Sequence, residues 1–84
     1  MITAQQLIDQ SPAAARLLVL LEDLRLLGKP QQPIVAERLH EHRLVARGQD
    51  SSGRAFVEVT RSGTAMALEL RELGVCADVP RVEP

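Results

Sequence analysis

The sequence predicts a small, mainly α-helical domain with one β-hairpin. Signals that start and stop helices recur along the first half of the chain and again after residue 60. Between them, the stretch LVARGQDSSGRAFVEVT (residues 44–60) contains two β-capable runs around a connection rich in Gly, Asp and Ser, which favour turns. Hydrophobic residues make up 45% of the chain, yet only Phe56 is aromatic, so the core must be aliphatic.

Each expected helix has its own boundary signals. Thr3, followed three residues later by Gln6, is typical of a capping box. Ser11 precedes a proline, which suits the first position of a helix, and Gly28 is a natural end for the helix that follows. Thr60 is expected to cap the last helix. The expected helices span about residues 3–9, 12–27, 33–43 and 61–73, and the expected strands about 44–47 and 54–60.

The second expected helix is apolar round most of its circumference in its first half. One stripe at i, i+3, i+4 spacing contains Leu17, Leu20, Leu21, Leu24 and Leu27, and Leu18 and Val19 fall off it. A helix of this kind is buried on more than one side. Either its own neighbours surround it, or part of it forms the seam of a dimer.

The composition excludes several classes of protein. Ten Lys and Arg against eleven Asp and Glu give a net charge of −1, so the chain as a whole has no attraction to nucleic acid or to an anionic membrane. Cys76 is the only cysteine, which excludes an internal disulfide and a Cys-based zinc site within one chain. The longest run of large apolar residues is too short to span a bilayer, and the first ten residues do not resemble a secretory signal. We therefore expect a cytoplasmic protein with no membrane partner.

The middle of the chain, LHEHRLVARGQDSSGRAFVEVTRSG (residues 39–63), resembles the signature of the multiple-antibiotic-resistance-regulator (MarR) type of winged helix. In that family the end of the recognition helix leads into a Leu-Val pair, an Arg, an Asp-containing wing, a second Arg and a strand that ends in Thr shortly before a Gly. The similarity covers about residues 39–70. The matching positions are Leu39, Leu44, Val45, Arg47, Asp50, Arg54, Val59, Thr60 and Gly63.

The resemblance implies a winged helix-turn-helix domain over residues 1–74. The residues that follow contain two prolines, so we expect a flexible tail over 75–84. The chain departs from the family pattern at two places. Arg43 stands where the family has Gly, and the stretch KPQQPIVAE (residues 29–37) contains two prolines, which shorten the helix that would read bases.

The leading hypothesis is a DNA-binding transcriptional regulator that acts as a homodimer on double-stranded DNA. Gln and Arg side chains have the geometry to read adenine and guanine edges, and exposed Lys and Arg side chains contact phosphates. The candidate base-reading residues are Gln31, Gln32 and Arg38; the candidate backbone contacts are Lys29, Arg47, Arg54 and Arg61, and Ser51 and Ser52 form the wing tip. For Arg54, an ion pair with Asp50 that shapes the wing is an equal alternative. Two exposed acids on the third helix, Glu37 and Glu41, oppose contact with phosphate.

The homodimer is expected to pair through the last helix, assisted by the second. Small winged helices often associate through an extension that follows the complete fold. The candidate interface residues are Leu18, Met66, Leu70 and Leu73.

The alternative hypothesis is a winged helix that binds another protein, as an adaptor, a subunit or a small inhibitor. The near-neutral charge and the surplus leucines of the second helix favour it. Phe56, expected on the outward face of the hairpin, would then be an anchor residue. Packing of Phe56 against the hairpin itself or against the last helix is the alternative, and it is slightly preferred.

An enzyme or a metal protein is not expected. His40 and His42 are two residues apart, so on a helix they point to nearly opposite sides, whereas a helical zinc pair needs a spacing of four. No nucleophile-base arrangement, nucleotide loop or paired catalytic carboxylates can be identified. The sequence therefore predicts no catalytic residue, no metal and no cofactor.

Overall fold

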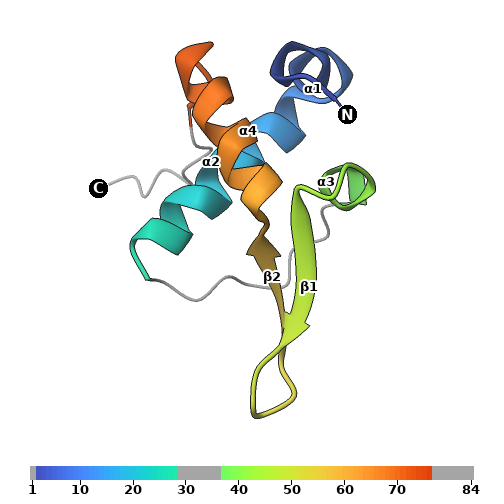
Figure 1. Ribbon diagram of the computed structural model, residues 1–84, viewed down its shortest axis with the longest axis vertical. Coiled ribbons are helices and arrows are strands. Elements are labelled where there is room, and N and C mark those ends of the chain that lie inside the picture. Colours follow the sequence, from blue (N-terminus) through green and yellow to red (C-terminus); the bar gives the residue numbers. More distant parts are fainter. Residues whose placement is uncertain (1, 29–36, 77–84) are drawn as a thin grey trace, which may run out of the picture.

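The computed structural model describes residues 2–28 and 37–76 (Figure 1). Within these ranges the chain is mainly helical with one two-stranded antiparallel hairpin, which confirms the coarse fold prediction. The elements in order are α1 (Ala4–Gln10), α2 (Pro12–Leu26), α3 (Glu37–Glu41), β1 (Val45–Gln49), β2 (Ala55–Val59) and α4 (Arg61–Glu72). The predicted beginning of the third helix, residues 33–36, lies outside the described residues.

Three helices begin at the predicted caps. The Thr3 hydroxyl accepts a hydrogen bond from the Gln6 amide (3.1 Å), and the Gln6 side chain accepts one from the Thr3 amide (2.9 Å), which completes the capping box. The Ser11 hydroxyl accepts from the amide of Ala14 at the start of α2, and the Thr60 hydroxyl accepts from the amide of Gly63 at the start of α4. Each cap satisfies an amide that has no partner within its own helix.

The end of α3 is fixed by a residue in the left-handed region. Arg43 has φ +57°. The amide of Leu44 donates to the carbonyl of Leu39 (2.9 Å) and the amide of Arg43 donates to the carbonyl of His40 (3.0 Å), the two bonds of a Schellman motif. Most helices use glycine at this position because a Cβ there costs about 1 kcal/mol. The chain reverses here directly into β1, so the strand starts at Val45 rather than at the predicted residue 44.

β1 extends further toward the hairpin tip than predicted, and β2 is shorter than predicted at both ends. β1 continues to Gln49 because Gly48 pairs with Phe56 and Gln49 with Ala55. The Phe56 ring lies over Gly48, where an added Cβ would be only 2.6 Å from the ring. Glycine therefore makes room for the aromatic ring, and the half-buried Phe56 packs across its own hairpin.

The core is aliphatic, and every described helix contributes leucine to it. The largest side chains with no more than about 1% of their surface exposed are Leu7, Leu18, Leu21, Leu39, Leu44, Leu70 and Val19. α2 lies at the centre, because it contacts α1, α3, α4 and β2. This arrangement explains why the first half of α2 is apolar on more than one side.

The predicted leucine stripe of α2 is displaced from the face that is buried most deeply. The helix buries Ala15, Leu18, Val19 and Glu22, together with Leu21, whereas Leu27 is 69% exposed. The spacing of leucines alone does not place Glu22 on the buried side, since a carboxylate is expected to face water. In the structure that carboxylate is buried because partners surround it.

Glu22 links α2 to α4. Its carboxylate accepts from the Thr64 hydroxyl of α4 (2.9 Å) and from the Nε of Arg25 (3.0 Å), and Arg71 of α4 forms an ion pair with the neighbouring Asp23. The hydrogen bonds from Arg25 hold the pKa of Glu22 below its usual value in spite of burial. The two helices are thus joined by polar groups at the edge of their apolar contact.

The base of α4 lies against the end of α3. The Thr60 hydroxyl donates to the carbonyl of Arg43 (2.7 Å), and the Thr60 amide donates to the carbonyl of Leu44 (3.0 Å). A Cβ on Gly63 would stand 2.0 Å from that Leu44 carbonyl oxygen, so only glycine allows the approach. These contacts fix the direction in which the hairpin leaves the helices.

The described chain continues past residue 74, where the predicted domain ends. Val75 donates its amide to the carbonyl of Leu70 (3.0 Å) and packs partly against the core. Residue 75 therefore belongs to the C-terminal cap of α4 and not to a loose tail. The rest of the predicted tail beyond Cys76 lies outside the described residues.

Replacing Arg43 by glycine should stabilise the protein. Glycine removes the cost of a Cβ at positive φ, and the greater freedom of the unfolded chain offsets part of the gain, so we expect a net increase of up to about 1 kcal/mol in the free energy of unfolding. Urea denaturation measures it. Arg43→Ala is the matched control, because it removes the same charge but keeps the Cβ. An equal gain in both variants would show that charge, and not backbone strain, sets the stability at this position.

Glu22 should make stability depend on acidity. Its folded pKa is lowered, so its contribution is complete above the unfolded value of about 4.3 and is lost as the pH falls through the folded value. Glu22→Gln should therefore be less stable than the parent at pH 7, and the difference should shrink on acidification toward pH 3. Thermal unfolding across this range tests it. Glu69→Gln, which alters an exposed carboxylate of α4, should leave the pH profile nearly unchanged; a gap between the parent and Glu22→Gln that stays constant with pH would contradict the prediction.

Candidate functional site

The hairpin extends away from the helices, and its tip is the part of the described chain that protrudes furthest from them (Figure 1). Asp50 organises the tip. Its carboxylate oxygen Oδ1 accepts from the Ser52 amide (2.9 Å), the Ser52 hydroxyl (2.6 Å) and the Arg54 amide (2.9 Å). The backbone closes the same loop, because the Asp50 amide donates to the Arg54 carbonyl and the Gly53 amide to the Asp50 carbonyl. A short loop with this many internal bonds has a defined shape before any ligand arrives.

The relation between Asp50 and Arg54 differs from the ion pair considered above. Asp50 holds the backbone amide of Arg54, and no ion pair with the Arg54 guanidinium is present among the described residues. The hydroxyl of Ser52 is the main cause that keeps the pKa of Asp50 below its usual value, followed by the Arg54 amide. The carboxylate thus shapes the tip, and it leaves the Arg54 guanidinium without an acidic partner in the part of the chain that the structure describes.

Four exposed arginines lie on the hairpin or at its base: Arg43, Arg47, Arg54 and Arg61. In the described part of the chain, none of the four takes part in an ion pair. By contrast, Arg25 and Arg71 are both paired with acids between or along the helices. Residues 43–61 contain these four arginines and two acidic residues, whereas the rest of the sequence contains six basic and nine acidic residues. Positive charge is therefore concentrated on the hairpin of a slightly acidic chain.

Of the three predicted base-reading residues, the structure describes only Arg38. Arg38 donates to the side-chain oxygen of Gln10 (3.2 Å), which directs it toward α1. Glu37 and Glu41 are exposed on α3 as predicted. Three further candidates, Lys29, Gln31 and Gln32, lie outside the described residues. Among described residues the structure thus brings together Arg47, Arg54, Ser51 and Ser52 on the hairpin and Arg61 at its base, but it does not join Arg38 to them.

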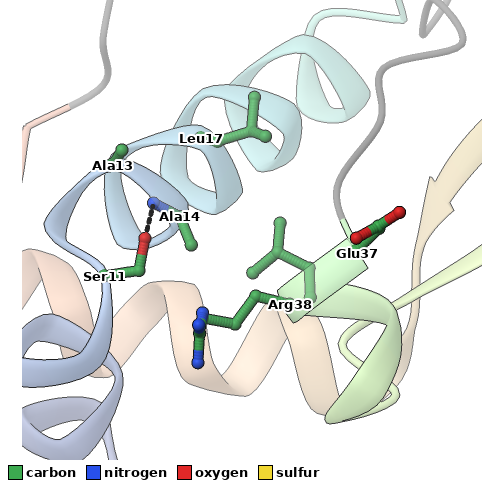
Figure 2. Close-up of a pocket in the computed structure, with 7 residues that line it drawn as sticks. Ser11, Ala13, Ala14, Leu17, Glu37 and Arg38 are labelled. Carbon is green, nitrogen blue, oxygen red and sulfur yellow. Dashed lines mark hydrogen bonds between the residues drawn. The ribbon is translucent and has the colours of Figure 1, made fainter.

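A groove of about 240 Å³ lies between the first turn of α2 and α3 (Figure 2). The Arg38 side chain extends along it toward the corner between α1 and α2, and Glu37 points the other way. Ser11 is at its edge, but its hydroxyl already caps α2 by accepting from the Ala14 amide (3.2 Å). A second groove, of about 300 Å³, runs between Ile2, Leu44 and the first half of α4, with Arg61 in its lining. Both grooves are largely apolar and neither pairs a nucleophile with a base.

The proposed dimer residues need correction. Leu18 and Leu70 have no exposed surface and Met66 is only 6% exposed, because all three lie in the core of their own chain. They can offer almost no area to a second copy. Leu73 alone among the four is exposed, at 53%. Phe56, the anchor considered for a protein partner, is half-buried against Gly48 of its own hairpin.

The described residues form neither a metal site nor a membrane-spanning helix. Within residues 2–28 and 37–76, no three His, Cys, Asp or Glu side chains are grouped so that they could hold a metal ion. In the same ranges no helix combines the length and the apolar character needed to cross a membrane. Comparison with models of protein families, with curated proteins and with solved structures gave no match.

Sequence reasoning missed two features of this region. Arg43 stands where the family pattern has glycine, and its stem was expected to face inward; it is instead exposed and adds a fourth arginine beside the hairpin. The bonds of Asp50 to backbone amides were also missed. The signal for them was present, since Asp followed two residues later by Ser in a turn favours such side-chain-to-backbone bonds.

Removing the Asp50 carboxylate should loosen the hairpin tip without affecting the core. In Asp50→Ala the Ser52 and Arg54 amides lose their shared acceptor, so their hydrogen exchange, followed by NMR, should accelerate several-fold while Leu70 stays protected. Asp50→Asn is the control, because its amide oxygen can still accept these bonds and should retain most of the protection. Unchanged exchange at Ser52 and Arg54 in the alanine variant would show that the backbone bonds alone define the tip.

Proposed function

We propose that this chain is a winged-helix protein that binds double-stranded DNA through its hairpin and acts as a transcriptional regulator in the form of a homodimer. The single observation that carries the proposal is a set of four exposed arginines on and beside a hairpin whose tip is already shaped, none of which forms an ion pair with another described residue. The hairpin is the wing in this proposal.

The order of the helices and strands supports the winged-helix fold in this proposal. Three helices precede the hairpin, the hairpin follows the end of α3 after only three residues, and α4 packs across α2. A winged helix has this plan, in which a hairpin lies beside a helix-turn-helix. The resemblance of residues 39–63 to the MarR signature includes Arg47, Asp50 and Arg54, and these are the residues that the hairpin displays or uses to order its tip.

The charge distribution supports duplex DNA as the ligand in this proposal. Duplex DNA is recognised first by its phosphates, and neutralising them with Arg or Lys releases counterions. Arg47 lies on β1, Arg54 lies in the loop directly before β2, and Arg43 and Arg61 lie at the base of the hairpin. Because Asp50 is engaged with amides and with Ser52, its negative charge is partly compensated within the tip.

The mode of binding differs from one led by a recognition helix. The exposed acids Glu37 and Glu41 make the outer face of α3 unfavourable beside phosphate, and Arg38 is directed toward Gln10. In the proposed complex the wing therefore supplies most of the binding free energy through the DNA backbone. Base recognition, if it comes from this chain, is left to the segment that precedes α3 and to the wing tip.

The proposal predicts strong salt dependence. If the four arginines each contact a phosphate, the logarithm of affinity should fall against the logarithm of salt with a slope of about −3.6 per chain, or roughly a hundredfold between 50 and 200 mM salt. Fluorescence anisotropy with a mixed-sequence duplex measures it. The double variant Arg47→Ala, Arg54→Ala should reduce the slope by about two and weaken binding to all sequences alike.

Arg16→Ala is the matched control, since Arg16 is exposed on α2 and lies outside the arginine-rich segment. It should change neither the slope nor the affinity by much. A parent protein without salt-sensitive affinity for the duplex would rule out the proposed function. The alternative, a winged helix that contacts another protein, would then take its place, because an apolar contact hardly responds to salt.

A further inference from the structure

The outer part of the hairpin, residues 46–56, contains one pair of half-buried residues. Gly48 and Phe56 are half-buried, and every other residue of this segment is exposed. The two residues are partners in the register of the strands, and an added Cβ on Gly48 would lie only 2.6 Å from Cζ of the Phe56 ring. The ring over Gly48 is therefore the main packing contact that the described chain makes in the part of the hairpin beyond the helices.

A protruding two-stranded ribbon needs such a contact to keep a defined shape. Isolated hairpins are only marginally stable in water, and two-stranded ribbons twist more strongly than larger sheets. A glycine inside a strand weakens it, since glycine has no side chain to pack, and an aromatic residue on the facing strand compensates by covering it. Phe56 thus limits the twist of the hairpin at the position of Gly48.

The Phe56–Gly48 pair lies between the positions of the two arginines of the wing. Arg47 directly precedes Gly48, and its partner in the register is Val57, so it lies on the opposite face of the hairpin from Phe56. Arg54 precedes Phe56 by two residues and by alternation continues its face. The relative placement of two side chains on opposite faces depends on the twist of the ribbon between them. The pair is therefore located where it can set how the two arginines are presented.

We propose that Phe56 is a positioning residue for the DNA contact of the wing. With its ring over Gly48, it holds Arg47 and Arg54 in the relative placement in which both reach phosphates of one duplex. This role rests on the proposed function, because Phe56 acts through the arginines that bind DNA there. Phe56 itself does not touch the DNA in this proposal, since its ring is already packed on its own hairpin.

The test is a double-mutant cycle that combines Phe56→Ala with the double variant Arg47→Ala, Arg54→Ala, measured by fluorescence anisotropy with the mixed-sequence duplex. In the parent, Phe56→Ala should weaken binding about three- to tenfold and reduce the salt slope by about one, because the two arginines no longer reach their phosphates together. In the background without these arginines, the same substitution should change the affinity by less than about twofold. A loss of equal size in both backgrounds would overturn the inference.

Gly48→Ala disrupts the same contact from the other strand and keeps the aromatic residue. The added Cβ displaces the ring, so this variant should lose affinity and slope as Phe56→Ala does. A ring that contacted DNA directly would be more accessible in Gly48→Ala; kept or strengthened binding in this variant would therefore contradict the positioning role. Phe56→Tyr is the conservative control, because it retains a ring over Gly48 and should keep most of the affinity.

NMR on the full chain without DNA tests the ordering itself. The ring should shift the Hα resonances of Gly48 in the parent, and the heteronuclear NOE of the Arg47 and Arg54 amides should fall in Phe56→Ala while that of Leu70 stays unchanged. Circular dichroism and urea unfolding establish that each variant keeps its helical core. Unchanged NOE values at both arginines would refute the positioning role.

The outcomes separate this inference from the proposed function. A parent that binds duplex DNA with the expected salt slope, but whose binding does not depend on Phe56, would remove the positioning role and leave the function of the wing. A parent without salt-sensitive binding would remove both.

Discussion

The burial of one face of α2 is the constraint on which the rest of the structure depends. Ala15, Leu18 and Val19 pack under α1, α4 and the base of β2, and α3 contacts the same helix. A chain of 84 residues with a single aromatic side chain has few large side chains to fill a core, so one central aliphatic helix must pack against all its neighbours. If α2 were displaced, α4 and the hairpin would lose their common support.

The orientation of the hairpin follows from that support through a short series of backbone contacts. Arg43 reverses the chain at the end of α3, Leu44 enters the core, and Thr60 bonds to both carbonyls before α4 begins. Gly63 allows α4 to approach within reach of Leu44. The direction of the tip is consequently set by the packed helices, and its local shape by Asp50. Both levels of order are in place before a ligand binds, which lowers the entropic cost of binding.

The polar groups divide into two sets with different consequences. Glu22, Thr64, Asp23 and Arg71 are engaged with one another and stabilise the α2–α4 junction. The arginines around the hairpin have no such acidic partners among the described residues. In a chain whose net charge is −1, this separation of paired from unpaired arginines gives a local basic surface that composition alone conceals.

The sequence by itself determined the elements and their boundaries at the caps, because Thr3, Ser11 and Thr60 act on amides only three residues away. It also determined the hairpin and the residues displayed on it, since alternation and turn chemistry are local. Only the tertiary structure decided which face of α2 is buried and which leucines remain in water. Those outcomes depend on partners distant in the chain: Glu22 is buried because Thr64, forty-two residues away, reaches it, and Leu70 and Met66 turn inward because α2 lies beneath them. A periodic pattern specifies that a helix has an apolar face, but where nearly all positions are leucine, packing alone selects that face.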